Sequence, residues 1–209
     1  MRLFESSLGG ELKAGELFGG NAGRNRAAQI LVQSFDLHDF YYRTEAMDMT
    51  WITDRIAVGG GIWSEDNMQE VARQGITHII NMQVEFDDRR LAEPFGIDVL
   101  WNPVDDDFMP KPPQVFRRGV DFALAALDEP GARLFVHCAA GVHRAPMMTL
   151  AILRALGWTL EHALDHIQAE RPVVDWADIY VWSVEEFIRN DDNRRTGSPE
   201  LSPGSGNPQ

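Results

Sequence analysis

The sequence predicts an α/β fold with a central, mainly parallel sheet flanked by helices. Three observations support this prediction. Short runs of apolar and β-branched residues alternate with helical patterns between residues 50 and 190. Glycine and proline stand at the points where one pattern gives way to the next. Strands interleaved with helices are typical of a parallel sheet that is covered on both faces.

Four segments are predicted as strands because they are rich in Val, Ile and other apolar residues. The first is closed by three consecutive glycines, Gly59, Gly60 and Gly61. The second is the most strongly β-branched of the four, which indicates a buried strand. In chain order, the predicted strands are residues 55–59, 76–82, 97–101 and 133–137.

Six helices are predicted around these strands. Ser64 is expected to cap the first helix and Gly75 to end it. The second should stop at Pro94, and the third should start at Pro112 and Pro113, where the missing N–H groups cost nothing. Gly157 and Pro172 separate the last three. In chain order, the predicted helices are residues 64–74, 87–93, 112–127, 144–156, 160–170 and 177–189.

Three regions are expected along the chain. Residues 1–49 form an N-terminal extension that is partly helical, with one helix expected over 26–42. Residues 50–190 form the folded domain. Residues 191–209 are rich in Pro, Gly, Ser and Asn, and this composition predicts a disordered tail.

Composition narrows the possible functions. The net charge of −13 and the absence of a Lys/Arg-rich stripe argue against nucleic-acid binding. No apolar run approaches the ~20 residues that a membrane span needs, and the first residues lack the pattern of a secretory signal. One cysteine excludes an intramolecular disulfide. Together these features predict a protein of the reducing cytoplasm.

The only cysteine stands in the most informative stretch, residues 137–146 (HCAAGVHRAP). A predicted strand precedes Cys138, small residues follow it, and a predicted helix then begins near Arg144. In such a loop the backbone N–H groups converge and the helix presents its positive end, which is how proteins bind phosphate. A helix N-terminus and nearby cations lower the pKa of a free cysteine from ~8.5 to roughly 3.5–7.5. We therefore predict that Cys138 is a nucleophile for a phosphate group.

We call residues 138–143 of this stretch the cradle. These residues and their neighbours His137 and Arg144 have complementary expected roles. Arg144 offers a planar guanidinium that bonds two phosphate oxygens at once. Gly141 allows a positive φ that brings the N–H groups together. His137 is expected to orient the loop by bonding a nearby carbonyl. The predicted phosphate-binding residues are Ala139, Ala140, Gly141, Val142, His143 and Arg144.

A phosphatase also needs an acid that protonates the leaving oxygen. Asp105, Asp106 and Asp107 directly follow the third predicted strand. They should therefore emerge at the same edge of the sheet as the cradle, where ligands bind in open α/β sheets. One of the three is expected to act as acid and then as base, and the scheme needs neither a metal ion nor a cofactor.

These motifs resemble the dual-specificity branch of the cysteine-dependent protein tyrosine phosphatase superfamily over about residues 50–190. The resemblance implies that family's compact α/β phosphatase fold and its phosphocysteine mechanism. Low-molecular-weight phosphatases carry the same Cys-x5-Arg motif near the N-terminus, which does not fit here. The matching segments are Arg55–Gly59, Gly75–Asn81, His137–Arg144 and Glu170–Pro172.

The same resemblance ranks the three aspartates. Family members commonly carry their acid in a Pro-hydrophobic-x-Asp pattern, which residues 103–106 (PVDD) match. Asp106 stands 32 residues before Cys138, a spacing similar to that in family members. The resemblance therefore implies Asp106 first, followed by Asp105 and Asp107.

Two departures from the family pattern bear on activity. Ala145 stands where most members have a Ser or Thr whose hydroxyl eases departure of the thiolate. The Asn that follows the Arg-Pro segment in the family is missing, and Asp175 and Trp176 stand nearby. The cradle and Ala145-Pro146 are also similar to plant glucan phosphatases, although no carbohydrate-binding module is recognisable beside them.

The expected function is hydrolysis of phosphate monoesters, with phosphoproteins as substrates. Phosphorylated glucan, sugar or inositol is an alternative, and six tryptophans offer stacking surfaces that core packing explains better. An alternative of another class is a phosphate-binding pseudophosphatase, which Ala145 favours. Two other functions are disfavoured. A cysteine protease that pairs Cys138 with His143 would give Arg144 no role. A metal site built on His137 and His143 would lack a third ligand.

Overall fold

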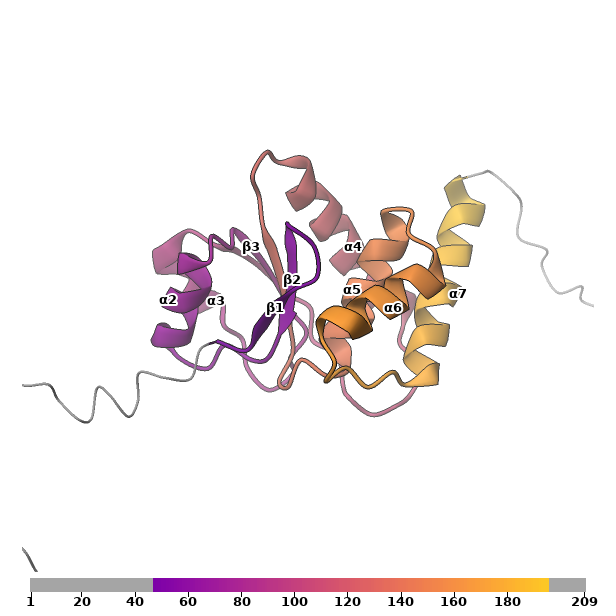
Figure 1. Cartoon of the computed structure of the whole chain (residues 1–209), viewed down its shortest axis with the longest axis horizontal. Coiled ribbons are helices and arrows are strands. Elements are labelled where there is room, and N and C mark those ends of the chain that lie inside the picture. Colours follow the sequence, from indigo (N-terminus) through magenta and orange to yellow (C-terminus); the bar gives the residue numbers. More distant parts are fainter. Residues whose placement is uncertain (1–46, 196–209) are drawn as a thin grey trace, which may run out of the picture. The chain divides into compact units, whose positions relative to one another are not determined.

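The computed structural model describes residues 47–195, and the expected helix over 26–42 and most of the expected N-terminal extension lie outside this range. A five-stranded sheet in the order β1-β2-β5-β3-β4 forms the centre (Figure 1). β1 runs antiparallel to β2, and the other neighbours are parallel. The strands are β1 (Met49–Trp51), β2 (Ile56–Gly59), β3 (His78–Asn81), β4 (Asp98–Trp101) and β5 (Leu134–His137).

Helices cover both faces of this sheet, which confirms the predicted fold class (Figure 1). α2 (Glu65–Arg73) and α3 (Arg89–Ala92), the latter continued by the 3₁₀ turn η1 (Glu93–Phe95), lie on one side. Ser64 caps α2 as predicted, because its Oγ accepts a hydrogen bond from Asn67 N–H at 3.2 Å. The other side carries α4 (Pro113–Asp128), α5 (Arg144–Ala155), α6 (Leu160–Glu170) and α7 (Asp178–Arg195).

Three elements differ from the prediction. β1 was not predicted, because three residues carry too little pattern and the strand is defined by its pairing with β2. The chain does not stop its helical path at Pro94 but passes through it as η1 and turns at Gly96, where φ is +65°. Proline is tolerated there because the first turn of a helix needs no N–H bond.

The third difference concerns the end of the domain. α7 extends to Arg195, so the first five residues of the predicted disordered tail are helical. Arg117 of α4 forms an ion pair with Asp191, which is 9% exposed, and this contact holds the last turns against α4. The polar composition of residues 191–195 indicates disorder, and it carries no information about an ion pair with a distant helix. Residues 196–209 lie outside the described range.

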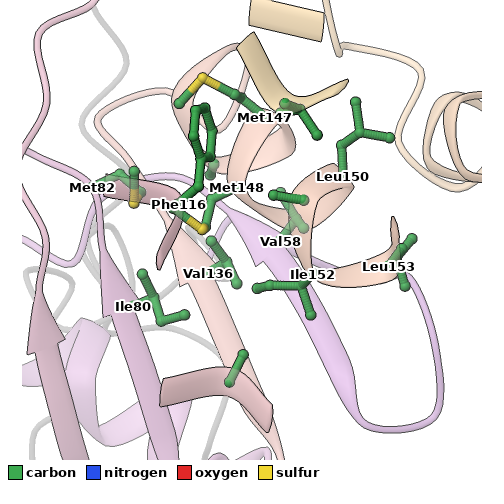
Figure 2. Packing of buried hydrophobic residues seen from close by; sticks show 14 of the residues in the cluster. Val58, Ile80, Met82, Phe116, Val136, Met147, Met148, Leu150, Ile152 and Leu153 are labelled. Atoms are coloured by element: carbon green, nitrogen blue, oxygen red, sulfur yellow. The ribbon is translucent and has the colours of Figure 1, made fainter. Parts of the chain in front are cut away.

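The core explains why the cradle has a fixed position. Alternate strand residues divide between two clusters, and Val58, Ile80 and Val136 face α5. Figure 2 shows side chains of α5, including Met148 and Ile152, pointing toward these strand residues. Ten of the twelve residues of α5 are buried. The N-terminus of α5, to which the cradle leads, is therefore held firmly above the central strand β5.

Candidate active site

The cradle spans residues 138–143, between the end of β5 and the start of α5. Cys138 lies at its base and is 1% exposed. Its N–H donates to Gly59 O at 3.4 Å, and Ala139 O accepts from Gly61 N–H at 3.1 Å. Because β5 is flanked by β2 and β3, Cys138 emerges at the middle of the sheet edge.

Gly141 has the positive φ that the sequence predicts, at +64°. A Cβ atom at this position would lie 2.5 Å from the carbonyl carbon of Gly59 and 2.5 Å from an Arg171 nitrogen. Both the backbone conformation and the close approach of two chain segments therefore require glycine.

Arg144 begins α5 and is 2% exposed. Its two terminal nitrogens donate to the two carboxylate oxygens of Glu85 at 3.0 and 2.9 Å. Burial opposes its charge, but the bonds to Glu85 and the nearby Cys138 raise the pKa of the guanidinium above its ordinary value. Nε is buried and has no hydrogen-bond partner within the described residues. The bonds to Glu85 thus fix the orientation of the guanidinium plane, and the Nε–H group remains to bind a ligand.

Glu85 was not identified from the sequence. It lies in the loop after β3, and hydrogen bonding by Arg144 lowers the pKa of its carboxyl group. Its carboxylate is therefore ionised at neutral pH and fixes the plane of Arg144. The only feature of the sequence that pointed to Glu85 was its position after a buried strand, at the edge of the sheet where the cradle lies.

Arg171 is a second residue at the cradle whose contacts there the sequence did not reveal. It is 4% exposed, and its Nε donates to Gly141 O at 2.9 Å. Its terminal nitrogens donate to both carboxylate oxygens of Asp48 at 2.8 and 2.6 Å, and to Thr50 Oγ1 at 3.0 Å. Arg171 therefore ties the cradle to the chain segment at β1.

We expect Arg171→Lys to lower kcat/KM about 10-fold, because each lost charge-assisted hydrogen bond to the cradle is worth about 1.5–3 kcal/mol. Arg55→Lys is the matched control. Like Arg171, Arg55 bonds the backbone through its guanidinium. It donates to three backbone carbonyls, at 2.8, 2.8 and 2.7 Å, but at the opposite edge of the sheet. Urea unfolding measures the loss of stability in each variant, and initial rates on an aryl phosphate measure the loss of kcat/KM. Equal losses of kcat/KM in both variants would assign Arg171 a stabilising role only.

The aspartate loop lies beside the cradle, and its three carboxylates have different surroundings. Asp106 Oδ2 is 3.7 Å from Arg144 Nε. Asp107 forms an ion pair with Lys111, and this hydrogen bond lowers the pKa of the Asp107 carboxyl group. Asp105 is exposed and has no hydrogen bond or ion pair within residues 47–195. The structure thus brings Asp106 to the cradle and directs Asp107 to a different partner.

The expectation for His137 is wrong. Its Nε2 lies 2.8 Å from Asp88 Oδ2, outside hydrogen-bonding geometry, and not beside a carbonyl. Both side chains are fully buried, and Asp88 Oδ1 accepts from Asn81 Nδ2 at 2.9 Å. Asp88 precedes α3, so its approach to β5 depends on the tertiary fold.

Two further findings concern the described part of the chain. Residues 47–195 contain no group of three or more His, Cys, Asp or Glu side chains arranged to hold a metal ion. None of the helices in this range has the length and apolar character that crossing a membrane requires.

Comparison with known protein families matches residues 62–189 to the dual specificity phosphatase catalytic domain. Protein phosphatase Slingshot homolog 3 of Rattus norvegicus is 33% identical over 118 residues, which are 55% of this chain and 17% of that protein. Dual specificity protein phosphatase 26 of Bos taurus is 33% identical over 112 residues, covering 53% of this chain and 51% of that protein. The chain thus spans about half or less of these curated relatives.

Solved structures show the same fold. The crystal structure of PTPMT1 aligns with a TM-score of 0.63 at 20% identity, covering 72% of this chain and 99% of that chain. The crystal structure of human DUSP28 aligns with a TM-score of 0.58 at 19% identity, covering 69% of this chain and 95% of that chain. At these identities the similarity concerns the fold alone.

Proposed function

This chain belongs to the dual specificity phosphatase family, and we propose that it is a cysteine-dependent phosphate monoester hydrolase that works through a phosphocysteine. The observation that carries the proposal is a convergence of three groups. Cys138 is the first residue of the cradle, Arg144 directly follows its last residue, and Asp106 lies 3.7 Å from Arg144 on a separate loop. A nucleophile, a charge clamp and an acid are the groups that this reaction needs.

In the first step, the cradle N–H groups and Arg144 hold the non-bridging oxygens of the phosphoryl group. The sulfur of Cys138 attacks phosphorus, so an S–P bond forms while the bond from phosphorus to the leaving oxygen breaks. Asp106 gives its proton to that oxygen. The guanidinium of Arg144 stabilises the charge on the phosphoryl oxygens, because its plane is already fixed by Glu85.

In the second step, water attacks the phosphocysteine, and Asp106, now a carboxylate, takes a proton from the water. The S–P bond breaks, and inorganic phosphate and the Cys138 thiolate are released. Ala145, which is fully buried, supplies no hydroxyl to assist the departing thiolate. We therefore expect this step to limit turnover with good leaving groups.

Phosphoproteins are the proposed substrates, because both curated relatives above are named as protein phosphatases. Phosphorylated glucan, phosphorylated sugar and inositol phosphate are the alternative substrates. Hydrolysis rates on these compounds are compared with the rate on a phosphoprotein. A catalytic thiolate suits a reducing compartment, so we propose the cytoplasm as the place of action.

The test is capture of the phosphocysteine. The protein is mixed with excess phosphotyrosine peptide in the presence of EDTA, denatured after one turnover, and digested for mass spectrometry. We expect one phosphoryl group on the peptide that contains Cys138. Phosphate release without that adduct would contradict the mechanism. Phosphate binding without release would identify a pseudophosphatase instead.

We expect Asp106→Asn to lower kcat on phenyl phosphate about 10²–10³-fold, because a positioned acid contributes about 10²–10⁴-fold. Asp105→Asn and Asp107→Asn are matched controls on the same loop, and each should stay within about twofold of wild type because neither contacts the cradle. Steady-state rates over a range of substrate concentrations provide the measurement. A large loss in either control, with Asp106→Asn unaffected, would move the acid to that residue.

A further inference from the structure

Asp106 stands in an exposed loop, yet both of its carboxyl oxygens are held. Tyr180 OH of α7 donates to Oδ1 at 3.0 Å. His143 Nδ1, from the last residue of the cradle, lies 3.1 Å from Oδ2. Two contacts from two different elements restrict rotation of the carboxyl group about its Cβ–Cγ bond.

The two partners of Asp106 are themselves fixed. The hydroxyl of Tyr180 accepts from Phe108 N–H at 3.0 Å, so its own proton is directed to Asp106. Burial raises the pKa of Tyr180 to about 12, which keeps this proton in place over the working pH range. The aromatic ring of Phe108 stacks on Tyr180 at 5.8 Å between centroids and meets His143 edge-on at 5.1 Å.

His143 bridges the cradle to two acidic segments. On its other side, Nε2 lies 3.6 Å from Asp175 Oδ2, in the segment that follows α6. Asp175 N–H also donates to Val142 O in the cradle at 3.2 Å. His143 thus links the nucleophile's loop directly to the loop of the proposed acid.

We propose that His143 and Tyr180 are positioning residues for Asp106, which together orient its carboxyl group toward the leaving oxygen of a substrate in the cradle. This inference rests on the proposed function, in which Asp106 is the acid. Neither residue is required to touch substrate or to transfer a proton. The expected contribution is alignment, since a misplacement of about 1 Å in a reacting group costs about 10²-fold.

The dependence of the rate on the leaving group distinguishes two possible roles of His143 and Tyr180. One is alignment of the acid Asp106, and the other is general stabilisation of the fold. Nitrophenyl phosphate has a leaving oxygen that departs without a proton, whereas phenyl phosphate needs one. The comparison is made in kcat/KM, because this quantity reports the steps up to formation of the phosphocysteine, in which Asp106 acts as acid. Damage to the acid therefore lowers kcat/KM much more for phenyl phosphate than for nitrophenyl phosphate. Damage to the fold or to phosphate binding slows both equally.

The experiment compares wild type, Asp106→Asn, His143→Ala, His143→Asn and Tyr180→Phe on both substrates, with thermal unfolding as a check on folding. We expect His143→Ala and Tyr180→Phe each to lose about 10-fold in kcat/KM on phenyl phosphate and less than about twofold in kcat/KM on nitrophenyl phosphate. His143→Asn should recover most of this loss, because its amide nitrogen can take the place of Nδ1 and donate to Asp106.

The possible failures are distinguishable. Equal losses of His143→Ala and Tyr180→Phe on the two substrates, or no loss on either, would overturn this inference if Asp106→Asn still shows the leaving-group dependence. If Asp106→Asn lacks that dependence while wild type is active, the acid is assigned wrongly and the inference fails with it. Wild type no faster than Cys138→Ser would overturn the proposed function itself.

Discussion

Cys138→Ser is expected to lower kcat on every phosphate monoester by about 10⁴-fold or more, the scale of loss that follows removal of a covalent nucleophile. A serine hydroxyl at this position stays protonated, because its acidity is far lower than that of a thiol. Among residues 47–195, no histidine forms a hydrogen bond with the Cys138 sulfur that could take the proton. His143 instead contacts Asp106, Asp175 and the ring of Phe108.

The variant should keep its fold and its affinity for phosphate. Serine is close to cysteine in size, and the N–H groups of the cradle and Arg144 are unchanged. Binding of a phosphotyrosine peptide, followed by calorimetry, therefore separates lost chemistry from lost structure. A variant that binds the peptide and still hydrolyses it at a rate near that of wild type would show that Cys138 is not the nucleophile.

Arg144→Lys is expected to lower kcat/KM by about 10²–10³-fold, the cost of removing a preorganised donor from a developing charge. Lysine keeps the charge and has three N–H groups, but it lacks the planar fork that bonds both oxygens of Glu85 while other N–H groups face the phosphate. The loss should appear in both kcat and KM, because the guanidinium holds the phosphoryl group before and during attack.

Arg154→Lys is a close control for this change. Arg154 lies on the same helix, α5, and pairs with both carboxylate oxygens of Glu185 at 2.7 and 3.3 Å. The two substitutions should cost similar stability in urea unfolding, while Arg154→Lys stays within about twofold of wild-type kcat/KM. Parallel losses of activity in the two variants would show that Arg144 acts through the stability of α5 alone.

The elements with strong local signals agree best between sequence and structure. Ser64 caps α2, and Gly141 takes a positive φ. Four of the five strands were expected because continuous apolar runs mark strands that are buried on both faces. By contrast, β1 and the last turns of α7 are stabilised by contacts with distant segments, which local composition does not record.

The candidate site divides in the same way. Cys138, Gly141 and Arg144 were recognisable because they share one short loop, in which spacing along the chain determines spacing in space. Glu85 and Arg171 were not recognised as part of the site. Each meets the cradle across a separation of tens of residues, as in the hydrogen bonds from Arg171 to Gly141 and from Arg144 to Glu85.

By itself, the sequence determined the α/β class, and it predicted the cradle and the chemistry proposed for its cysteine, since these depend on residue types and on spacing within single segments. Only the tertiary structure decided which aspartate lies beside Arg144, which carboxylate fixes the plane of that arginine, and what holds Asp106. Those relations depend on where separate loops meet at the edge of the sheet. Where these loops meet is set by the packing of α5 on the strands and of α7 on α4 and α5, rather than by any pattern along the chain.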